Sequence, residues 1–210
     1  MSPLVSLAPL VPVTVFRPLR YGAAQRENRD CHPLAVPFSL DVGTGDGYLA
    51  FRVADQGYNV LGIDSGSFDY SMNSIKTARQ KARAKGTCVQ FKKAFLAGLR
   101  RGRARFDYMV ASQAVHCMRD QPQNIKVIYE LLRPGGAFLC MDLHVGLRGF
   151  LQHGWHAFLA LSEEEWKNLL SGCGFQEPSF RNANNYLVVK ARKPPSRGTG
   201  ARARKRGACR

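Results

Sequence analysis

Hydrophobic and polar positions follow two different periods along residues 38–64. Apolar residues alternate with polar ones over residues 38–42, as they do in a half-buried strand. They recur at helical spacing over residues 49–54, and a second short apolar run over residues 60–63 ends at Asp64. A strand, a helix and a second strand in this order predict a βαβ unit.

Strands and helices continue to alternate in the pattern that follows. The predicted elements are helices over residues 71–85 and up to Leu132, and strands over residues 89–95, 108–111 and 137–141. Ser162 and Glu165 have the spacing of a capping box, which predicts the start of a last helix before a final pair of strands. This alternation favours an α/β fold built on a mostly parallel sheet.

Three glycines, Gly43, Gly45 and Gly47, lie at alternate positions after Asp41, between the first strand and its helix. Glycine has no Cβ, so this loop lets the backbone approach a ligand closely. A glycine loop at a helix N-terminus holds nucleoside-bearing ligands, and an acid after the second strand accepts ribose hydroxyls. Dinucleotide sites use the spacing G-x-G-x-x-G, whereas the spacing here is G-x-G-x-G behind a carboxylate. A carboxylate repels a pyrophosphate but suits an ammonium or sulfonium, so an NAD-dependent oxidoreductase is disfavoured.

The motif D-V-G-T-G-D-G, with Asp64 placed 23 residues after its first acid, resembles the first motif of class I S-adenosylmethionine-dependent methyltransferases. Further similar segments are a strand led by F-D, a loop that carries His116, and L-R-P-G-G before the fifth strand. The resemblance covers about residues 38–194. It implies a single domain with a Rossmann-like, doubly wound, mostly parallel seven-stranded sheet, and S-adenosyl-L-methionine as the cofactor.

The resemblance also implies which positions bind this cofactor. They are the acid before the glycine loop, the loop, the ribose acid with its neighbour, and positions after the third and fourth strands: Asp41, Gly43, Thr44, Gly45, Gly47, Asp64, Ser65, Phe95 and Ser112. Asp64 ends a strand as the ribose acid does, whereas Asp69 has the usual distance to the next helix, so both are candidates. Family members carry an adenine-binding acid where this chain has Ala94 and Phe95. Phe95 is therefore either a residue that packs on the adenine or a core aromatic.

His116 is the candidate catalytic residue, in the loop after the fourth strand. Methyl transfer from a sulfonium is an in-line displacement, so the enzyme mainly aligns the acceptor and excludes water. The loop A-S-Q-A-V-H-C lacks the prolines of amino-methylating nucleic-acid enzymes, and Cys117 lacks the setting of a cytosine-C5 nucleophile. His116 would act as a general base with a pKa near 6 to 7 or orient the acceptor, and lining the cofactor pocket is the alternative. His144 is a weaker pocket candidate.

Composition adds a regional charge to this picture. The chain has 210 residues, which is enough for one α/β domain, and a formal net charge of +16. Residues 70–106 contain eleven Lys or Arg residues and no acidic residue. Residues 190–210 contain nine Lys or Arg residues and no acidic residue. We expect an irregular N-terminal arm over residues 1–36, a methyltransferase domain over residues 37–194, and a disordered basic tail over residues 195–210.

The acceptor classes are a small molecule, which is favoured, and RNA. The basic tail is a candidate contact for nucleic acid, whereas the basic face of the helix over residues 71–85 is expected to be solvated. The alternative function is a catalytically weak or inactive methyltransferase-like protein that binds RNA or a protein partner through its basic regions. Six cysteines without a C-x-x-C pair predict no metal site and an intracellular location, in the cytoplasm, the nucleus or an organelle. No apolar run is long enough to predict a transmembrane helix.

Overall fold

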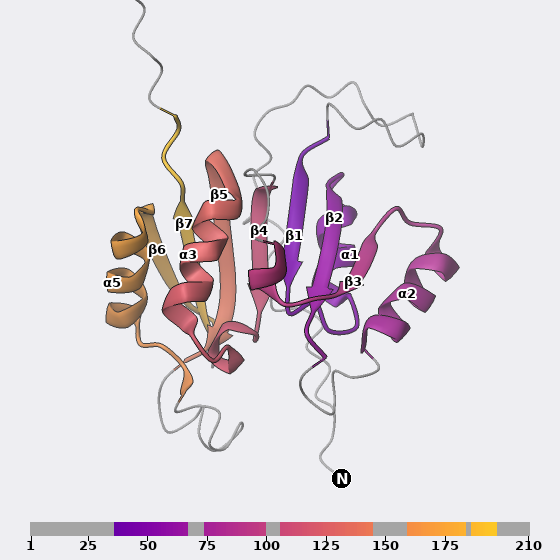
Figure 1. Ribbon diagram of the computed structural model, residues 1–210, viewed down its shortest axis with the longest axis horizontal. Coiled ribbons are helices and arrows are strands. Elements are labelled where there is room, and N and C mark those ends of the chain that lie inside the picture. The colour runs from indigo at the N-terminus through magenta and orange to yellow at the C-terminus, as the bar shows by residue number, and fades with distance from the viewer. Residues whose placement is uncertain (1–35, 67–73, 100–105, 145–158, 184–185, 197–210) are drawn as a thin grey trace, which may run out of the picture. The chain divides into compact units, whose positions relative to one another are not determined.

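The computed structural model describes residues 36–66, 74–99, 106–144, 159–183 and 186–196. Seven strands form one sheet in the order β3-β2-β1-β4-β5-β7-β6 (Figure 1). Their bounds are β1 Phe38–Val42, β2 Asn59–Asp64, β3 Gln90–Lys93, β4 Phe106–Ser112, β5 Leu132–Leu143, β6 Gln176–Ala183 and β7 Tyr186–Arg192. Strands β1 to β5 pair in parallel, and β7 is antiparallel to both β5 and β6. The predicted mostly parallel seven-stranded sheet is confirmed.

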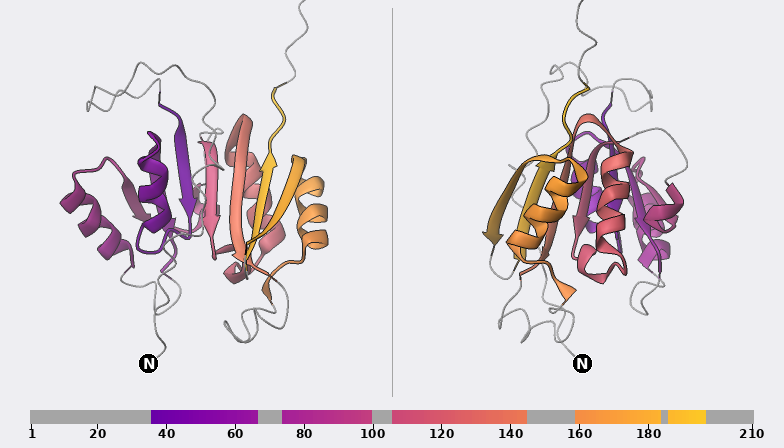
Figure 2. Two further views of the ribbon diagram at one scale, coloured as in Figure 1. Left: turned by 180° about the vertical axis from the view of Figure 1, so that it is seen from behind. Right: turned by 60° about the vertical axis from the view of Figure 1, so that its left-hand side comes forward.

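Helices pack on both faces of this sheet. Within the described ranges they are α1 Tyr48–Ala54, α2 Ser74–Lys85, α3 Gln121–Leu131 and α5 Glu163–Cys173, with short 3-10 helices η3 Leu96–Leu99 and η4 Val115–Cys117. Helices α3 and α5 lie in front of the sheet in Figure 1, and α1 comes forward when the molecule is seen from behind (Figure 2). The predicted N-terminal arm and nearly all of the predicted basic tail lie outside the described residues.

The central strands are apolar because both of their faces are covered. Leu40, Met109 and Phe138, on β1, β4 and β5, are fully buried, and so is Ile125 of α3. Trp166 of α5 packs on Phe138 with their ring centroids 6.4 Å apart. The carboxyl ends of β1, β2, β4 and β5 therefore meet along one edge of a well-packed sheet, which is where ligands bind in open α/β folds.

Several strand boundaries differ from the prediction, and those of β5 and β3 have visible causes. Strand β5 begins at Leu132 rather than at residue 137, because the L-R-P-G-G segment joins the sheet through an irregularity in its pairing with β4. Strand β3 ends at Lys93, since the next amide, that of Ala94, donates to the Asp64 carbonyl oxygen at 2.9 Å and the chain then turns into η3. Phe95 consequently follows the strand instead of ending it.

The capping box at the start of α5 is confirmed. The Ser162 hydroxyl accepts from the Glu165 amide at 3.3 Å, and the Glu165 carboxylate accepts from the Ser162 amide at 2.7 Å. We expect Ser162→Ala to lower the free energy of unfolding by about 1 kcal/mol, because it removes this N-cap. Urea unfolding followed by circular dichroism measures the change. Ser171→Ala, at an exposed position of the same helix, is the matched control and should change stability by less than half as much.

Candidate functional site

The glycine loop between β1 and α1 takes a conformation that requires glycine. Gly43, Gly45 and Gly47 have φ angles of +70°, +53° and +88°. The amides of Gly43 and Thr44 both donate to the Ile63 carbonyl oxygen at 2.9 Å, which ties the loop to the end of β2. A Cβ at Gly43 would lie 2.4 Å from the Ala114 Cβ, whereas a Cβ at Gly45 would meet nothing within 4 Å. The loop thus touches the segment after β4, and the space over Gly45 is open.

Asp41, the acid before this loop, is buried with one oxygen unsatisfied. The side chain is 1% exposed, and its Oδ2 accepts from the Thr44 hydroxyl at 2.7 Å. No hydrogen-bond partner reaches its Oδ1, which is also buried. Burial raises the pKa of Asp41 to about 7, although the Thr44 hydroxyl and the backbone of Ala50 oppose the change. A buried carboxylate oxygen of this kind is suited to a positively charged ligand group.

Asp64 holds the end of β2 and the glycine loop together. Its Oδ2 accepts from the Gly45 amide at 3.1 Å, and its Oδ1 accepts from the Gly66 amide at 2.9 Å. A carboxylate can accept about four hydrogen bonds, so these two leave capacity for ligand hydroxyls. Ser65 follows directly and is half-buried. The competing ribose candidate, Asp69, lies outside the described residues.

The end of β3 presents an aromatic and a cation where the resemblance implied an acid. Phe95 is 66% exposed, so the alternative of a core aromatic is wrong. The side chain of Lys93 lies against Gly66, since its Cε would be 2.9 Å from a Cβ at that glycine. No acidic residue occurs in the sequence from residue 70 to residue 106.

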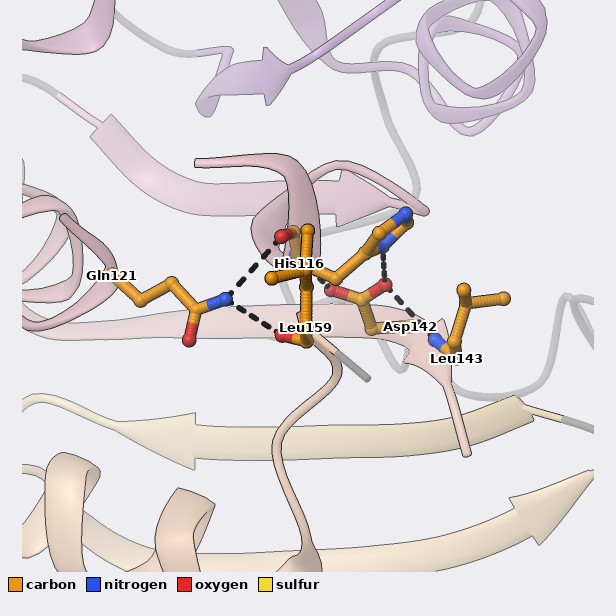
Figure 3. Close-up of polar contacts among 5 residues, drawn as sticks. All are labelled: His116, Gln121, Asp142, Leu143 and Leu159. Carbon is orange, nitrogen blue, oxygen red and sulfur yellow. Dashed lines mark hydrogen bonds and ion pairs between the residues drawn. The ribbon is translucent and has the colours of Figure 1, made fainter. Parts of the chain in front are cut away.

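His116, in η4, forms a buried pair with Asp142 at the end of β5 (Figure 3). The two side chains are 7% and 3% exposed. Asp142 Oδ1 contacts His116 Nδ1 and accepts from the Leu143 amide, and its Oδ2 accepts from the His116 amide at 2.9 Å. The other ring nitrogen of His116 points away from Asp142 in Figure 3.

The environment of His116 favours its protonated form. Burial alone would lower the pKa of His116, but hydrogen bonds to Asp142 and Cys117 and the negative charge of Asp142 together raise it to about 9. The expectation of a pKa near 6 to 7 is therefore wrong. The physical reason is Asp142, a carboxylate 26 residues away in the sequence that the fold places beside the imidazole.

Gln121, at the start of α3, connects η4 to the segment that follows residue 158. Its Nε2 donates to the Leu159 carbonyl oxygen at 2.9 Å and to the His116 carbonyl oxygen at 3.4 Å (Figure 3). Ser112 ends β4 and is half-buried, and the next amide, that of Gln113, donates to the Met141 carbonyl oxygen at 2.7 Å. These contacts fix the loop after β4 to the end of β5.

The structure thus brings most of the predicted site residues to one edge of the sheet, in three groups. The glycine loop joins Asp41 and Asp64, Ala114 lies against Gly43 two residues before His116, and Phe95 lies beyond Asp64. His144 is exposed and is not part of the His116 pair. Three further ring-bearing residues between β5 and α5, which the sequence also offers as candidates for an acceptor pocket, fall outside the described residues: His153, Trp155 and His156.

Asp142 is the functional residue that the sequence patterns did not single out. It interrupts an apolar strand near its carboxyl end, as Asp41 does in β1 and Asp64 does in β2. An acid at the end of a buried parallel strand was therefore the available signal, because a charge is seldom buried there without a partner.

The described residues also bear on metal ligands, a basic surface and membrane-spanning helices. No group of three His, Cys, Asp or Glu side chains able to hold a metal ion occurs in these parts of the chain. Three of the five basic residues of α2 contact the domain itself: Arg79 donates to the Phe91 carbonyl oxygen, Lys81 pairs with Asp46, and Lys85 lies over the Phe51 ring. The face is nevertheless largely exposed, as expected, with Lys76, Arg79, Arg83 and Lys85 all exposed. No helix within the described ranges is long and apolar enough to cross a membrane.

Comparison with known proteins gives the same class as the fold and the site. The chain matches a family model described as a methyltransferase domain over residues 39–172. It is 27% identical over 135 residues to a ubiquinone biosynthesis O-methyltransferase of Methylobacterium sp. (strain 4-46), covering 63% of this chain and 52% of that protein. The corresponding protein of Nitrosospira multiformis is 29% identical over 126 residues, covering 60% and 49%.

Solved structures share the fold at low sequence identity. Phosphoethanolamine N-methyltransferase 2 of Haemonchus contortus, in complex with S-adenosyl-L-methionine, has a TM-score of 0.66 at 17% identity, covering 76% of this chain and 49% of that one. A SAM-dependent methyltransferase of Methanosarcina mazei has a TM-score of 0.62 at 21% identity, covering 76% and 93%.

The sheet order and the acid-led glycine loop define the class of a Rossmann-like class I methyltransferase domain. The family match covers more than half of the sequence, and the chain belongs to this methyltransferase domain family. It spans about half the length of the curated relatives it matches.

Proposed function

We propose that the chain transfers a methyl group from S-adenosylmethionine to a hydroxyl oxygen of a small-molecule acceptor. The observation that carries this proposal is the buried, unpartnered Oδ1 of Asp41 at the head of the glycine loop. An unsatisfied buried acceptor is costly, and more so when it is charged. A ligand that brings a positive charge to this point would remove the cost.

The residues at the carboxyl edge fit S-adenosylmethionine. Asp41 and the backbone around Gly43 and Gly45 would hold its positively charged methionine part, since the space over Gly45 is open. Asp64 would accept from the ribose hydroxyls with the capacity that its two amide contacts leave. When bound, this cofactor supplies a methyl group that is already activated on a sulfonium. The protein then needs to align an acceptor and keep water away.

The pair of His116 and Asp142 favours an acidic hydroxyl as the acceptor. A phenol titrates near pH 10, close to the pKa of about 9 that the environment gives to His116. The acceptor proton can therefore pass to the imidazole at small cost when the oxygen attacks. Asp142 stabilises the imidazolium that forms. The two relatives described above are named O-methyltransferases of ubiquinone biosynthesis, which supports an oxygen nucleophile on a small molecule.

Calorimetry and a transfer assay test this proposal. Titration of the purified chain should show binding of S-adenosylmethionine and S-adenosylhomocysteine but not of NAD. Radiolabelled S-adenosylmethionine should then label a panel of phenols and catechols, and leave amines of similar size and an RNA oligonucleotide unlabelled. A folded chain that binds neither sulfur ligand would contradict the proposed activity, and label in RNA alone would contradict the acceptor class.

The affinity for S-adenosylmethionine is expected to fall as the pH drops below 7. Asp41 must be ionised to meet the cationic ligand, and its pKa of about 7 without ligand means that protons compete with binding below that pH. The association constant should decrease by up to about tenfold per pH unit between pH 7 and pH 5. Calorimetric titrations across this range measure the slope. Asp41→Asn keeps the side-chain shape, and should bind the ligand more weakly at pH 8 and lose most of this pH dependence. If the pH dependence persisted in this variant, a group other than Asp41 would be the one that takes up the competing proton.

A further inference from the structure

Three large apolar side chains are exposed in the part of the chain that the structure describes, and all three belong to the site edge. Tyr48 follows the glycine loop, Phe95 follows β3, and Leu159 is held near η4 by Gln121. Phe95 is the most exposed of them, at 66%. An aromatic ring left in water forgoes the stabilisation that its burial would give, so a ligand surface that covers Phe95 would be favourable.

The sheet order places Phe95 where the base of a bound nucleoside would lie. The glycine loop follows β1, Asp64 ends β2, and β3 is the next strand on the side away from β1. The Ala94 amide donates to the Asp64 carbonyl oxygen at 2.9 Å, which fixes the start of the Phe95 segment beside the ribose acid. A ligand with its methionine part at Gly45 and its ribose at Asp64 therefore extends its base toward Phe95.

The charged side chains of this segment are all cations, which donate hydrogen bonds and cannot accept them. The exocyclic amino group of adenine is a donor, so a side chain that recognises it must accept a hydrogen bond. The described segment from Ser74 to Leu99 contains no carboxylate. Its charged side chain nearest to Asp64 is Lys93, in register with that acid, and an ammonium has three donors and no acceptor.

We propose that this chain recognises the cofactor base by stacking on Phe95 and does not read its exocyclic amino group. This inference rests on the proposed function. Hypoxanthine has the same ring system as adenine, with a carbonyl oxygen in place of the amino group and a hydrogen on N1, so both hydrogen-bonding groups of that edge are reversed. Aromatic stacking depends little on either change. The site therefore accepts inosyl ligands nearly as well as adenosyl ligands.

The test compares S-adenosyl-L-homocysteine with S-inosyl-L-homocysteine by calorimetry on the full chain. In the unmodified protein the two dissociation constants should differ by less than tenfold. Phe95→Ala should weaken both ligands by about tenfold, because stacking is lost for either base. Leu159→Ala removes another exposed apolar side chain of the same edge and should leave both affinities within twofold. Phe95→Asp supplies an acceptor, and should shift the preference toward the adenosyl ligand by at least fivefold.

Two results would overturn the inference while leaving the proposed function in place. One is a preference of tenfold or more for the adenosyl ligand in the unmodified protein. If Asp69→Asn removed that preference, Asp69 would be the side chain that accepts a hydrogen bond from the adenine amino group. The other is a Phe95→Ala variant that binds both ligands within threefold of the unmodified protein, since the ring would then not contact the base. If the folded chain binds neither ligand, the proposed function fails and this inference fails with it.

Discussion

His116→Asn is expected to lower the turnover of methyl transfer by about 10²–10⁴ and to leave the affinity for S-adenosylmethionine within about threefold. The reason is that asparagine can still donate to Asp142 and keep η4 in place, but cannot take up a proton. Initial rates at saturating acceptor and a separate cofactor titration measure the two effects. His144→Asn changes the exposed histidine of the same region, and its turnover should match that of the unmodified protein.

The pH dependence of turnover distinguishes proton transfer from a passive role. Methyl transfer by this route requires His116 to be neutral before it takes the proton of the acceptor hydroxyl. The rate should therefore rise with pH as His116 loses its proton, and level off near pH 9. Asp142→Asn removes the charge that keeps the imidazole protonated, and burial then lowers the pKa of His116 below its ordinary value. The rise should move to lower pH by at least two units, and the plateau should fall because the base is weaker. Normal turnover in His116→Asn, with an unchanged pH profile, would leave His116 as a pocket-lining residue.

Gly45→Arg is expected to abolish cofactor binding, with at least a 100-fold loss of affinity. The open space above Gly45 is the space that the proposed ligand needs, and an arginine side chain would occupy it and bring a positive charge beside Asp41. Calorimetry with S-adenosylhomocysteine measures the loss.

Gly57→Arg is a matched control for this substitution. Gly57 also has a positive φ angle, +87°, and open space around its Cβ position, but it lies after α1 at the opposite end of the strands. The backbone strain of a non-glycine residue is on the order of 1–2 kcal/mol in both variants. Equal loss of binding in the two variants would trace the effect to strain rather than to the ligand space.

The fold was largely predictable because its signals are local. Apolar periods, the three glycines and the capping box each act within a few residues, and these features are confirmed. Strand ends were less predictable: β5 starts five residues early because its pairing with β4, rather than its own sequence, decides where it joins the sheet.

The glycine loop and Asp64 could be placed from the sequence because they belong to one continuous βαβ unit. The partner of His116 could not, since η4 and the end of β5 meet only through tertiary packing. The pKa of His116 was mistaken for the same reason, because it is set by that partner. The exposure of Phe95 also depends on where β3 stops, which the apolar pattern placed two residues too late.

The buried carboxylate of Asp41 makes the stability of the folded chain depend on pH and on ligand. Its pKa is raised from 3.8 to about 7, so the folded state binds more protons than the unfolded state between these values, and stability is lost as the pH rises through them. The difference corresponds to a destabilisation on the order of 4 kcal/mol at neutral pH, a large share of the net stability of a small domain. A cationic ligand offsets this cost only while it is bound. The chain without cofactor is therefore expected to be less stable at neutral pH than at mildly acidic pH, and binding of the cationic ligand to restore the difference.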